Sequence, residues 1–130
     1  MDKKIASTAL VFGFISIVLG AFGAHALKKI LAPEQLASFE VGVRYMMYHT
    51  LFLLFVSMTT FMEMKQKKIV FYLTLLGTTL FSGSIFLLAS SGVMGLNLRF
   101  LGLITPIGGL FLIASWIITF YYIGIKKRNI

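Results

Sequence analysis

Long apolar segments alternate with short charged segments along almost the whole chain. None of the apolar segments contains Lys, Arg, Asp or Glu, and each is close to the ~20 helical residues that cross a ~30 Å hydrocarbon layer. The four segments are Ile5–Leu27, Tyr45–Met62, Ile69–Ser90 and Gly102–Ile125. The pattern predicts an all-α membrane protein, a four-transmembrane-helix bundle that forms a single domain over residues 1–130.

The composition agrees with a membrane protein. Hydrophobic residues make up 58% of the chain and charged residues 12%, which is about half the charged share of an average soluble domain. The chain has no cysteine, and this excludes disulfides, thiolate metal sites and thiol nucleophiles. Candidate chemistry is therefore sought among the few polar side chains inside the apolar segments.

The positive charges predict the orientation in the membrane. The net charge is +8, and the Lys and Arg residues flank the apolar segments instead of forming a patch with aromatic residues, so we expect no nucleic-acid partner. Four spans place both termini and the middle loop on one side, which carries Lys3, Lys4, Lys65, Lys67, Lys68, Lys126, Lys127 and Arg128. The other side carries Lys28, Lys29, Arg44 and Arg99. Since cytoplasmic loops are richer in Lys and Arg, both termini are predicted to face the cytoplasm.

A short amphipathic extension is predicted before the second membrane helix. Pro33 suits the first turn of a helix, as does Glu34 beside it. A straight helix from Pro33 to Met62 would be ~45 Å long, which exceeds the hydrocarbon layer. We therefore expect its first part to lie at the outer interface and to bend near Gly42. The helices are thus expected at about 5–27, 33–63 (including the interfacial part), 69–90 and 102–125.

Small residues predict where the helices pack closely. Ser16, Gly20 and Ala24 are spaced four residues apart and share one helix face. Small side chains at such spacing allow two helix backbones to approach each other in lipid. The residues assigned to helix packing are Ser16, Gly20, Gly23, Ala24, Ser84, Gly108 and Gly109. The alternative is that glycine and alanine are simply common in membrane helices.

Six polar residues are predicted to form one cluster in the outer half of the bundle, namely His25, Glu40, Arg44, Tyr48, His49 and Thr105. His25 lies three residues before Lys28 and His49 five residues after Arg44, which places both histidines within ~8 Å of the outer boundary. Glu40 and Arg44 have the i, i+4 spacing of an ion pair. Ionisable groups at membrane depth are candidates for function. The alternatives are histidines that bond only backbone or headgroups, and a solvated Glu40–Arg44 pair.

Trp116 does not fit the aromatic belts at the membrane boundaries. It lies ten residues, ~15 Å, before Lys126, which places it near mid-depth. An indole N–H at that depth needs a hydrogen-bond acceptor. The sequence therefore predicts an inward-facing Trp116.

The sequence contains no recognisable catalytic or metal-binding pattern. It lacks a nucleophile triad, paired carboxylates, a phosphate-binding loop and an H-x-x-x-H motif. A metal site made by the two histidines and Glu40 is disfavoured, because His49 lies half a turn around a straight helix from Glu40. We therefore assign no catalytic residues, no metal and no cofactor.

Several motifs together resemble a known family. They are Gly20–Lys28, the set Glu40, Gly42, Arg44, Tyr45, Tyr48 and His49, the segments Leu80–Ser84 and Ile104–Gly109, and Trp116. Over essentially its full length the chain resembles the bacterial membrane-protein family called domain of unknown function 423, relatives of eukaryotic transmembrane protein 256. The resemblance implies a four-helix integral protein of the bacterial plasma membrane. Because that family has no established activity, the resemblance implies no catalytic role.

Three hypotheses for the function follow from the sequence. The first is a non-enzymatic bundle in membrane homeostasis that binds membrane lipids, a hydrophobic ligand or a partner protein through its outer-leaflet face. The second is a small-molecule or ion transporter that assembles as a homo-oligomer, since four helices are few for a pathway. The third is a membrane enzyme with His25 or His49 as a base, for which no second catalytic group stands at a deducible spacing.

Overall fold

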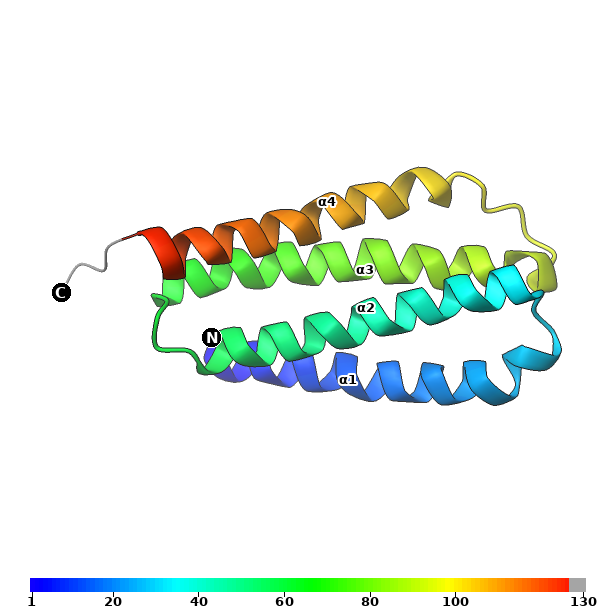
Figure 1. Ribbon diagram of the computed structural model, residues 1–130, viewed down its shortest axis with the longest axis horizontal. Helices are drawn as coiled ribbons and strands as arrows, with labels where there is room; N and C mark the ends of the chain where they lie inside the picture. The colour runs from blue at the N-terminus through cyan, green and yellow to red at the C-terminus, as the bar shows by residue number, and fades with distance from the viewer. Residues whose placement is uncertain (127–130) are drawn as a thin grey trace.

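Four long helices follow one another in antiparallel order in the computed structural model (Figure 1). The structure describes residues 1–126. The helices are α1 (Asp2–His25), α2 (Pro33–Met58), α3 (Met64–Met94) and α4 (Leu101–Phe120), with a 3-10 turn η1 (Leu27–Lys29) and a π-helical turn η2 (Tyr121–Ile125). All four are long and apolar enough to cross a membrane, which confirms the predicted fold. Lys127 and Arg128, which contribute to the predicted charge bias, lie outside the described residues.

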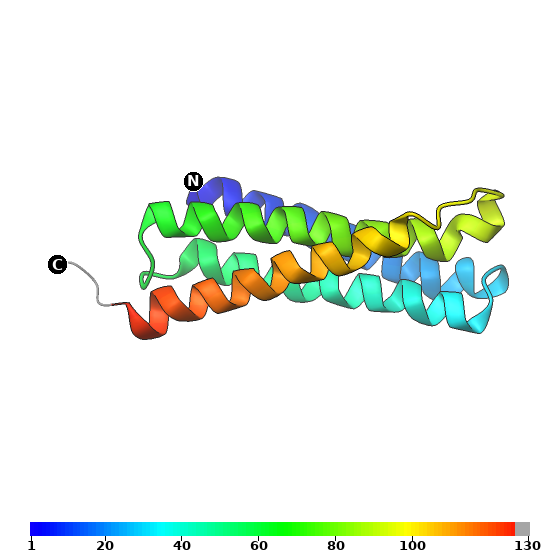
Figure 2. The ribbon, with the colours of Figure 1, turned by 90° about the horizontal axis from the view of Figure 1, so that it is seen from above.

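The helices α2 and α3 form the centre of the bundle, and α1 and α4 form its two edges. α1 packs on α2, α2 on α3, and α3 on α4, so the helices lie side by side in chain order (Figure 1). Seen from above, α4 crosses α3 obliquely and its second half passes toward α2 (Figure 2). The start of α1 and the end of α4 lie at the same end of the bundle, here named the terminus-bearing end.

Small polar side chains are concentrated inside the bundle, and large apolar side chains cover its outside. Phe14 is 70% exposed and Leu103 is 75% exposed. The buried hydroxyl side chains are Ser16, Thr50, Ser57, Thr74, Thr78, Ser82, Ser84, Ser115 and Thr119. Apolar side chains gain little by leaving lipid for protein, so helix association in a membrane depends on close packing and interhelical hydrogen bonds.

The central helix α3 makes such hydrogen bonds to both neighbours. Ser82 Oγ donates to the Gly42 carbonyl of α2 at 2.8 Å, and Thr74 Oγ1 donates to Ser115 Oγ of α4 at 3.0 Å. Both bonds are buried. They fix the register of α3 against α2 and α4.

Gly108 allows α4 to touch the backbone of α3. A Cβ atom added at Gly108 would overlap the backbone of Leu80 and Phe81, whereas one at Gly109 would lie 3.7 Å from the Phe81 ring. Ser84, the packing residue expected on α3, is buried one turn further along this contact. The close approach of α3 and α4 therefore depends on Gly108, and Gly109 contributes ordinary contact only.

The helices α1 and α2 pack through a second set of small residues. A Cβ atom at Gly23 would lie 3.2 Å from the Phe39 ring, and one at Gly20 would lie 3.4 Å from Val43. These contacts set an antiparallel register in which residue 20 of α1 faces residue 43 of α2.

Ser16 lies on the buried face of α1, but Ala24 does not. Ser16 is buried and donates to the Phe12 carbonyl at 2.8 Å. Ala24 is exposed, so it is removed from the packing face assigned to it above. A strict repeat of four residues advances ~400° per step and drifts around the helix, whereas the contact face follows the 3.6-residue period.

The turn between α2 and α3 lies earlier in the chain than the apolar pattern predicts. α2 ends at Met58 and α3 begins at Met64, before Ile69. The Glu63 N–H donates to Gln66 Oε1 at 3.0 Å, which caps the start of α3. The basic residues expected in the turn, Lys65, Lys67 and Lys68, therefore lie at the start of α3. A helix that extends past the apolar layer has polar ends, so the apolar pattern underestimates its length.

The helix α2 is continuous through Gly42, the position where a bend was predicted. α2 runs without interruption from Pro33 to Met58. Gly42 serves packing instead, because a Cβ atom there would lie 2.7 Å from the Phe86 ring of α3. The residues before Gly42 thus continue directly into the membrane helix.

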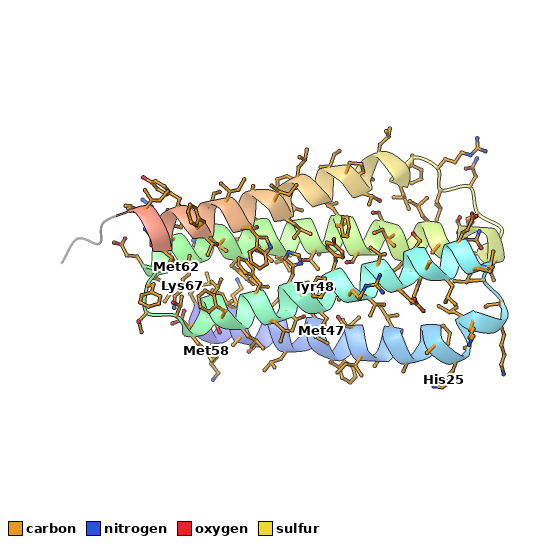
Figure 3. All side chains as sticks on the ribbon, viewed as in Figure 1. His25, Met47, Tyr48, Met58, Met62 and Lys67 are labelled. Carbon is orange, nitrogen blue, oxygen red and sulfur yellow. The ribbon has the colours of Figure 1, made fainter. Side chains whose placement is uncertain are left out.

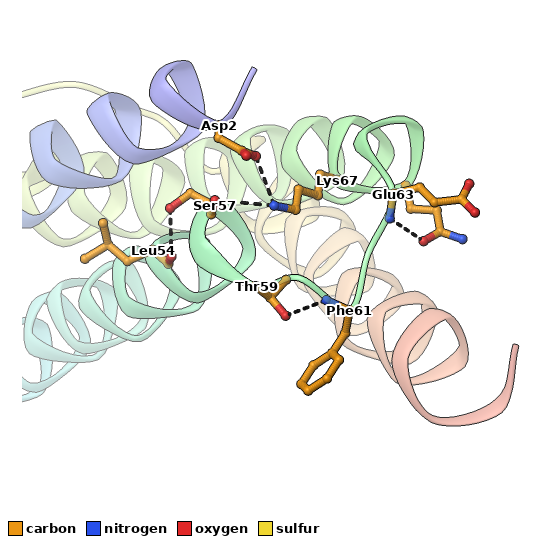
Figure 4. A network of polar contacts seen from close by, with 8 residues as sticks. Asp2, Leu54, Ser57, Thr59, Phe61, Glu63 and Lys67 are labelled. Carbon is orange, nitrogen blue, oxygen red and sulfur yellow. Dashed lines mark hydrogen bonds and ion pairs between the residues drawn. The ribbon is translucent and has the colours of Figure 1, made fainter. Parts of the chain in front are cut away.

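Lys67 joins three helices at the terminus-bearing end (Figure 4). Its side chain is 5% exposed, and Nζ lies 3.0 Å from Asp2 Oδ1 of α1. The same Nζ donates to the Ser57 carbonyl of α2 at 3.4 Å. Among residues 1–126 no second ion pair is formed.

Gly108→Ala is expected to lower the free energy of unfolding by about 1–3 kcal/mol, because the added methyl group meets the α3 backbone, which cannot move aside as a side chain can. The measurement is unfolding of the detergent-solubilised protein by SDS titration, followed by circular dichroism. The matched control is Gly109→Ala, where the methyl group has room. Equal losses in the two variants would contradict the close α3–α4 contact.

Asp2→Asn is expected to lower the free energy of unfolding by about 1 kcal/mol or less, since Asp2 is 46% exposed and solvent screens the pair. In a Lys67→Met background the same change is expected to have no effect, because its partner is gone. The same SDS titration measures this double-mutant cycle. A Lys68→Met background serves as the control, and there the effect of Asp2→Asn should remain.

Candidate functional site

A hydrogen bond between Trp116 and His49 connects α4 to α2 in the middle of the bundle. Trp116 Nε1 donates to His49 Nε2 at 3.0 Å. The Phe52 ring stacks on the Trp116 ring, with 4.4 Å between centroids and 26° between planes. His49 is 4% exposed, whereas Trp116 is 51% exposed. The indole N–H is therefore turned inward, and the ring itself lies at the surface between the two helices.

Both nitrogen atoms of the His49 ring are engaged. Nδ1 lies 2.7 Å from the Tyr45 carbonyl, which can only accept a hydrogen bond, so Nδ1 carries the proton. Nε2 accepts from the Trp116 N–H, so it carries the lone pair. These partners select one neutral tautomer, and they leave His49 no lone pair for a metal or a substrate proton.

A groove with aromatic walls runs between α2 and α4 on both sides of Trp116, here named the α2–α4 groove. The part toward the terminus-bearing end has a volume of ≈ 490 Å³ and is lined by Tyr48, Leu51, Phe52, Phe55, Trp116, Thr119, Phe120, Ile123 and Gly124. The other part has ≈ 440 Å³ and is lined by Tyr45, His49, Phe81, Gly109, Leu112, Ile113, Trp116 and Ile117. Both parts are in the size range of ligand sites. The groove arises where α4 crosses α3 obliquely (Figure 2), and the Trp116 side chain reaches α2 across it.

One residue of the groove wall has a buried polar atom without a partner among the described residues. Thr119 is buried, and its Oγ1 forms no hydrogen bond with any described residue. The same holds for the hydroxyls of Thr50 and Thr78, neither of which lines this part of the groove. A buried hydroxyl usually has a partner. Because Thr119 Oγ1 is covered by protein atoms, a molecule in the groove reaches it only when the Thr119 side chain rotates.

The two histidines lie far apart along the bundle axis. Gly13 of α1 packs against Thr50 of α2, and Gly20 packs against Val43. On this register His25 is level with about residue 38 of α2, eleven residues before His49, which corresponds to ~17 Å. His25 is exposed at the end of α1 (Figure 3), so the two side chains do not share a site.

The other members of the expected cluster are also separated. The Thr105 hydroxyl bonds to Ser84 of α3 and belongs to the α3–α4 packing. Tyr48 lines the groove together with Tyr45, with 5.4 Å between ring centroids, and it lies mid-way along α2 (Figure 3). The structure thus brings Tyr48, His49 and Trp116 together, and it leaves His25 and Thr105 elsewhere.

Arg44 lies near the middle of α2, not at its outer boundary. It stands 11 residues after Pro33 and 14 before Met58, within ~3 Å of the helix midpoint. Glu40 is one turn closer to the outer end. Both are exposed, and neither forms an ion pair among the described residues. An Arg at the centre of a membrane helix costs about 2.5–3.5 kcal/mol.

Apolar side chains on the edge helices lie further out than Arg44. Phe22 of α1 is 52% exposed and Leu103 of α4 is 75% exposed. The contact of Gly20 with Val43 places Phe22 about level with Glu40. The contact of Thr105 with Ser84 places Leu103 at about the same level. The apolar surface therefore continues past Arg44, and the error in the expected depth of His49 came from taking Arg44 as the boundary.

Comparisons with known proteins identify the family. The model of the family described as "Protein of unknown function (DUF423)" matches residues 19–109. A UPF0382 membrane protein of Staphylococcus haemolyticus is 37% identical over 114 residues, 85% of this chain and 89% of its own length. The UPF0382 inner membrane protein YgdD of Escherichia coli is 37% identical over 112 residues, 83% of this chain and 79% of its own length. A UPF0382 membrane protein of Haemophilus influenzae is 33% identical over 130 residues, 100% of both chains.

The chain belongs to the DUF423 family. It is a multi-pass membrane protein of unknown function, and the family resemblance noted from the sequence is confirmed. No solved structure matches it. The family match includes His49 and ends before Trp116.

The aromatic walls of the groove in this DUF423 protein were not predicted. Phe52 and Phe55 look like ordinary apolar residues of a membrane span, and only their place on α2 opposite α4 gives them a role. The usable signal was the mid-depth indole N–H, which required an acceptor. It did not identify that acceptor, because the depth of His49 depends on where α2 begins.

Trp116→Phe is expected to remove the donor while keeping a ring against Phe52. In ¹⁵N spectra of histidine-labelled protein in lipid, His49 should appear as the Nδ1–H tautomer. In the variant its Nε2 signal should move toward that of a nitrogen that accepts no hydrogen bond, with a stability loss of about 0.6–1.7 kcal/mol. His25, the other of the two histidines, is the internal control. An unchanged Nε2 signal would contradict the Trp116–His49 bond.

Proposed function

We propose that this DUF423 protein is a non-enzymatic protein of the bacterial plasma membrane that holds the acyl chain of a lipid in the α2–α4 groove. The observation that carries the proposal is the groove section nearest the terminus-bearing end, where an apolar and aromatic wall contains the unpartnered Thr119 hydroxyl. We further propose that both termini lie in the cytoplasm, as the basic residues indicate.

The chemistry of the groove favours a ligand with a long apolar part. His49 and Trp116 are hydrogen-bonded to each other, so neither ring offers a free nitrogen to a ligand. The polar atoms left in the middle of the groove are the hydroxyls of Tyr45 and Tyr48. The walls are aromatic and aliphatic, and such surfaces bind hydrocarbon through area and dispersion contacts. A lipid chain therefore fits this groove better than an ion or a small polar molecule.

The polar end of the ligand is expected near the terminus-bearing end. Thr119 lies seven residues, ~10 Å, before Lys126. A rotation of the Thr119 side chain toward the groove would let its hydroxyl donate to an ester or carboxyl oxygen, and Lys126 at the boundary suits an anionic headgroup. The proposed ligand is thus a lipid of the leaflet on that side, with its chain directed toward Trp116.

The non-enzymatic part of the proposal is supported by the state of the two histidines. Both nitrogens of His49 are engaged, and His25 is exposed at a helix end with no catalytic partner beside it in the described residues. Transport, the alternative from the sequence, needs a polar path, whereas the groove walls are apolar.

Thr119→Val is expected to weaken binding of a one-chain anionic phospholipid roughly 2- to 10-fold, because valine keeps the shape and removes one hydrogen bond. Native mass spectrometry of the protein in mild detergent, titrated with that lipid, gives the affinity. The matched control is Thr50→Val, which removes another unpartnered hydroxyl away from the groove and should leave the affinity unchanged.

Gly124→Leu tests whether the groove itself is the binding site. Gly124 lines the section that holds Thr119, so a leucine side chain there should compete with the acyl chain and reduce lipid retention several-fold. Circular dichroism checks that the variant remains folded. Undiminished retention in both Thr119→Val and Gly124→Leu would overturn the proposal.

A further inference from the structure

The face of α2 that is turned away from the bundle carries two opposite charges that the single chain does not pair. Glu40 and Arg44 are exposed, and neither forms an ion pair within residues 1–126. At ~100° per residue they lie on either side of the direction opposite Gly42, the residue that meets α3. Both therefore face the surroundings of the bundle, with Arg44 near the midpoint of the helix.

We propose that a second copy of this chain covers this face, so that Arg44 of each copy pairs with Glu40 of the other. A two-fold axis along the membrane normal keeps both copies at the same depth and in the same orientation. Such an interface is isologous, so each contact occurs twice. The two chains thus form two ion pairs, and each Glu40 and Arg44 side chain has a partner of opposite charge.

The geometry of a helix favours this pairing. Side chains on an α-helix lean toward its N-terminus, so the Arg44 guanidinium extends from the middle of α2 toward the level of Glu40. A pair within one helix would leave several of the five guanidinium N–H donors turned toward hydrocarbon. In the dimer both carboxylates lie around the axis, within reach of both guanidinium groups.

A lipid headgroup is a weaker candidate for this partner. Anionic headgroups lie at the boundary, whereas exposed apolar residues such as Phe22 and Leu103 lie further out than Arg44. An anionic headgroup would also leave the Glu40 carboxylate without a cation. The second copy provides both charges in the required arrangement, and this charge complementarity selects it as the occupant.

The rest of the same face is suited to helix contact. Ala37 lies about two turns before Arg44 and is small enough for close approach. Met47 follows on the other side and is half-buried. Flexible Met side chains adapt to an apolar partner surface. The two charges do not line the α2–α4 groove, so charge variants test the dimer without altering the lipid site.

The first test uses the absence of cysteine from the chain. Ala37→Cys introduces a single thiol on the proposed interface, and oxidation in native membranes is expected to give a disulfide-linked dimer on a non-reducing gel. The matched control is Ala24→Cys, the same change at nearly the same level on the exposed side of α1, which should remain monomeric. Equal cross-linking at the two positions would overturn the proposal.

The second test exchanges charges in the Ala37→Cys background. Arg44→Glu gives a chain with two negative charges on this face, and Glu40→Arg gives a chain with two positive charges. Each alone is expected to lose roughly tenfold or more of its cross-linked dimer, since like charges then meet at membrane depth. Co-expression of the two variants, with tags of different size, should restore cross-linking as the heterodimer.

The heterodimer distinguishes the proposal from its rivals. Pairing within one helix cannot be restored by co-expression, because each variant carries charges of one sign only. A different protein as the partner would give no preference for the mixed pair. Cross-linking that is equal in homodimers and heterodimers, or a band joining Ala37→Cys only to another protein, would overturn the proposal. The amount of full-length protein in the membrane fraction controls for failure to insert.

Discussion

A bilayer offers no hydrogen-bond partners in its interior, so every polar group of a membrane bundle must find one within protein or remain costly. In this chain α3 satisfies that constraint for its neighbours. Its hydroxyl side chains bond to α2 through Gly42 and to α4 through Ser115. The glycines stand beside these bonds and allow the short distances that they require. The close glycine contacts and the interhelical hydrogen bonds thus depend on each other. Together they determine the position of α4 over α3.

The edge helix α1 is held differently. Its side-chain bonds to other helices are confined to its first turn, where Asp2 meets Lys67 and Lys4 meets Tyr72 at 3.0 Å. The rest of α1 packs through Ile5 and Ala9 and through glycines that meet Phe39, Val43 and Thr50. Because these contacts carry no directional bond, α1 covers α2 without shaping a polar site. The opposite edge, where α4 leaves α3 and approaches α2, is where the groove forms.

The sequence predicted the number, type and order of the elements, because an uncharged segment of about 20 residues has few other stable structures. It did not predict helix ends, since polar residues such as Lys67 and Gln66 continue a helix beyond the apolar layer. Because of that error, Arg44 was predicted to lie at the membrane boundary, and His25 and His49 were predicted to lie at the same depth. Register between helices depends on contacts such as Gly20 with Val43, and no single-chain pattern contains that information. The need of Trp116 for an acceptor was readable, but the identity of the acceptor was not.

The two faces of α2 that do not pack on α1 or α3 differ in which polar groups still lack a partner. On the side toward α4, His49 and Trp116 are hydrogen-bonded to each other, and among the described residues Thr119 holds the one buried hydroxyl of the groove wall that lacks a partner. Such a surface recognises shape and tolerates lipid. On the side turned away from the bundle, full charges lie near the helix midpoint, and lipid cannot solvate them at low cost. For this reason we propose a lipid for the first face, and for the second a requirement for protein. Because both charges stand on one chain in complementary positions, the simplest protein that meets this requirement is the chain itself.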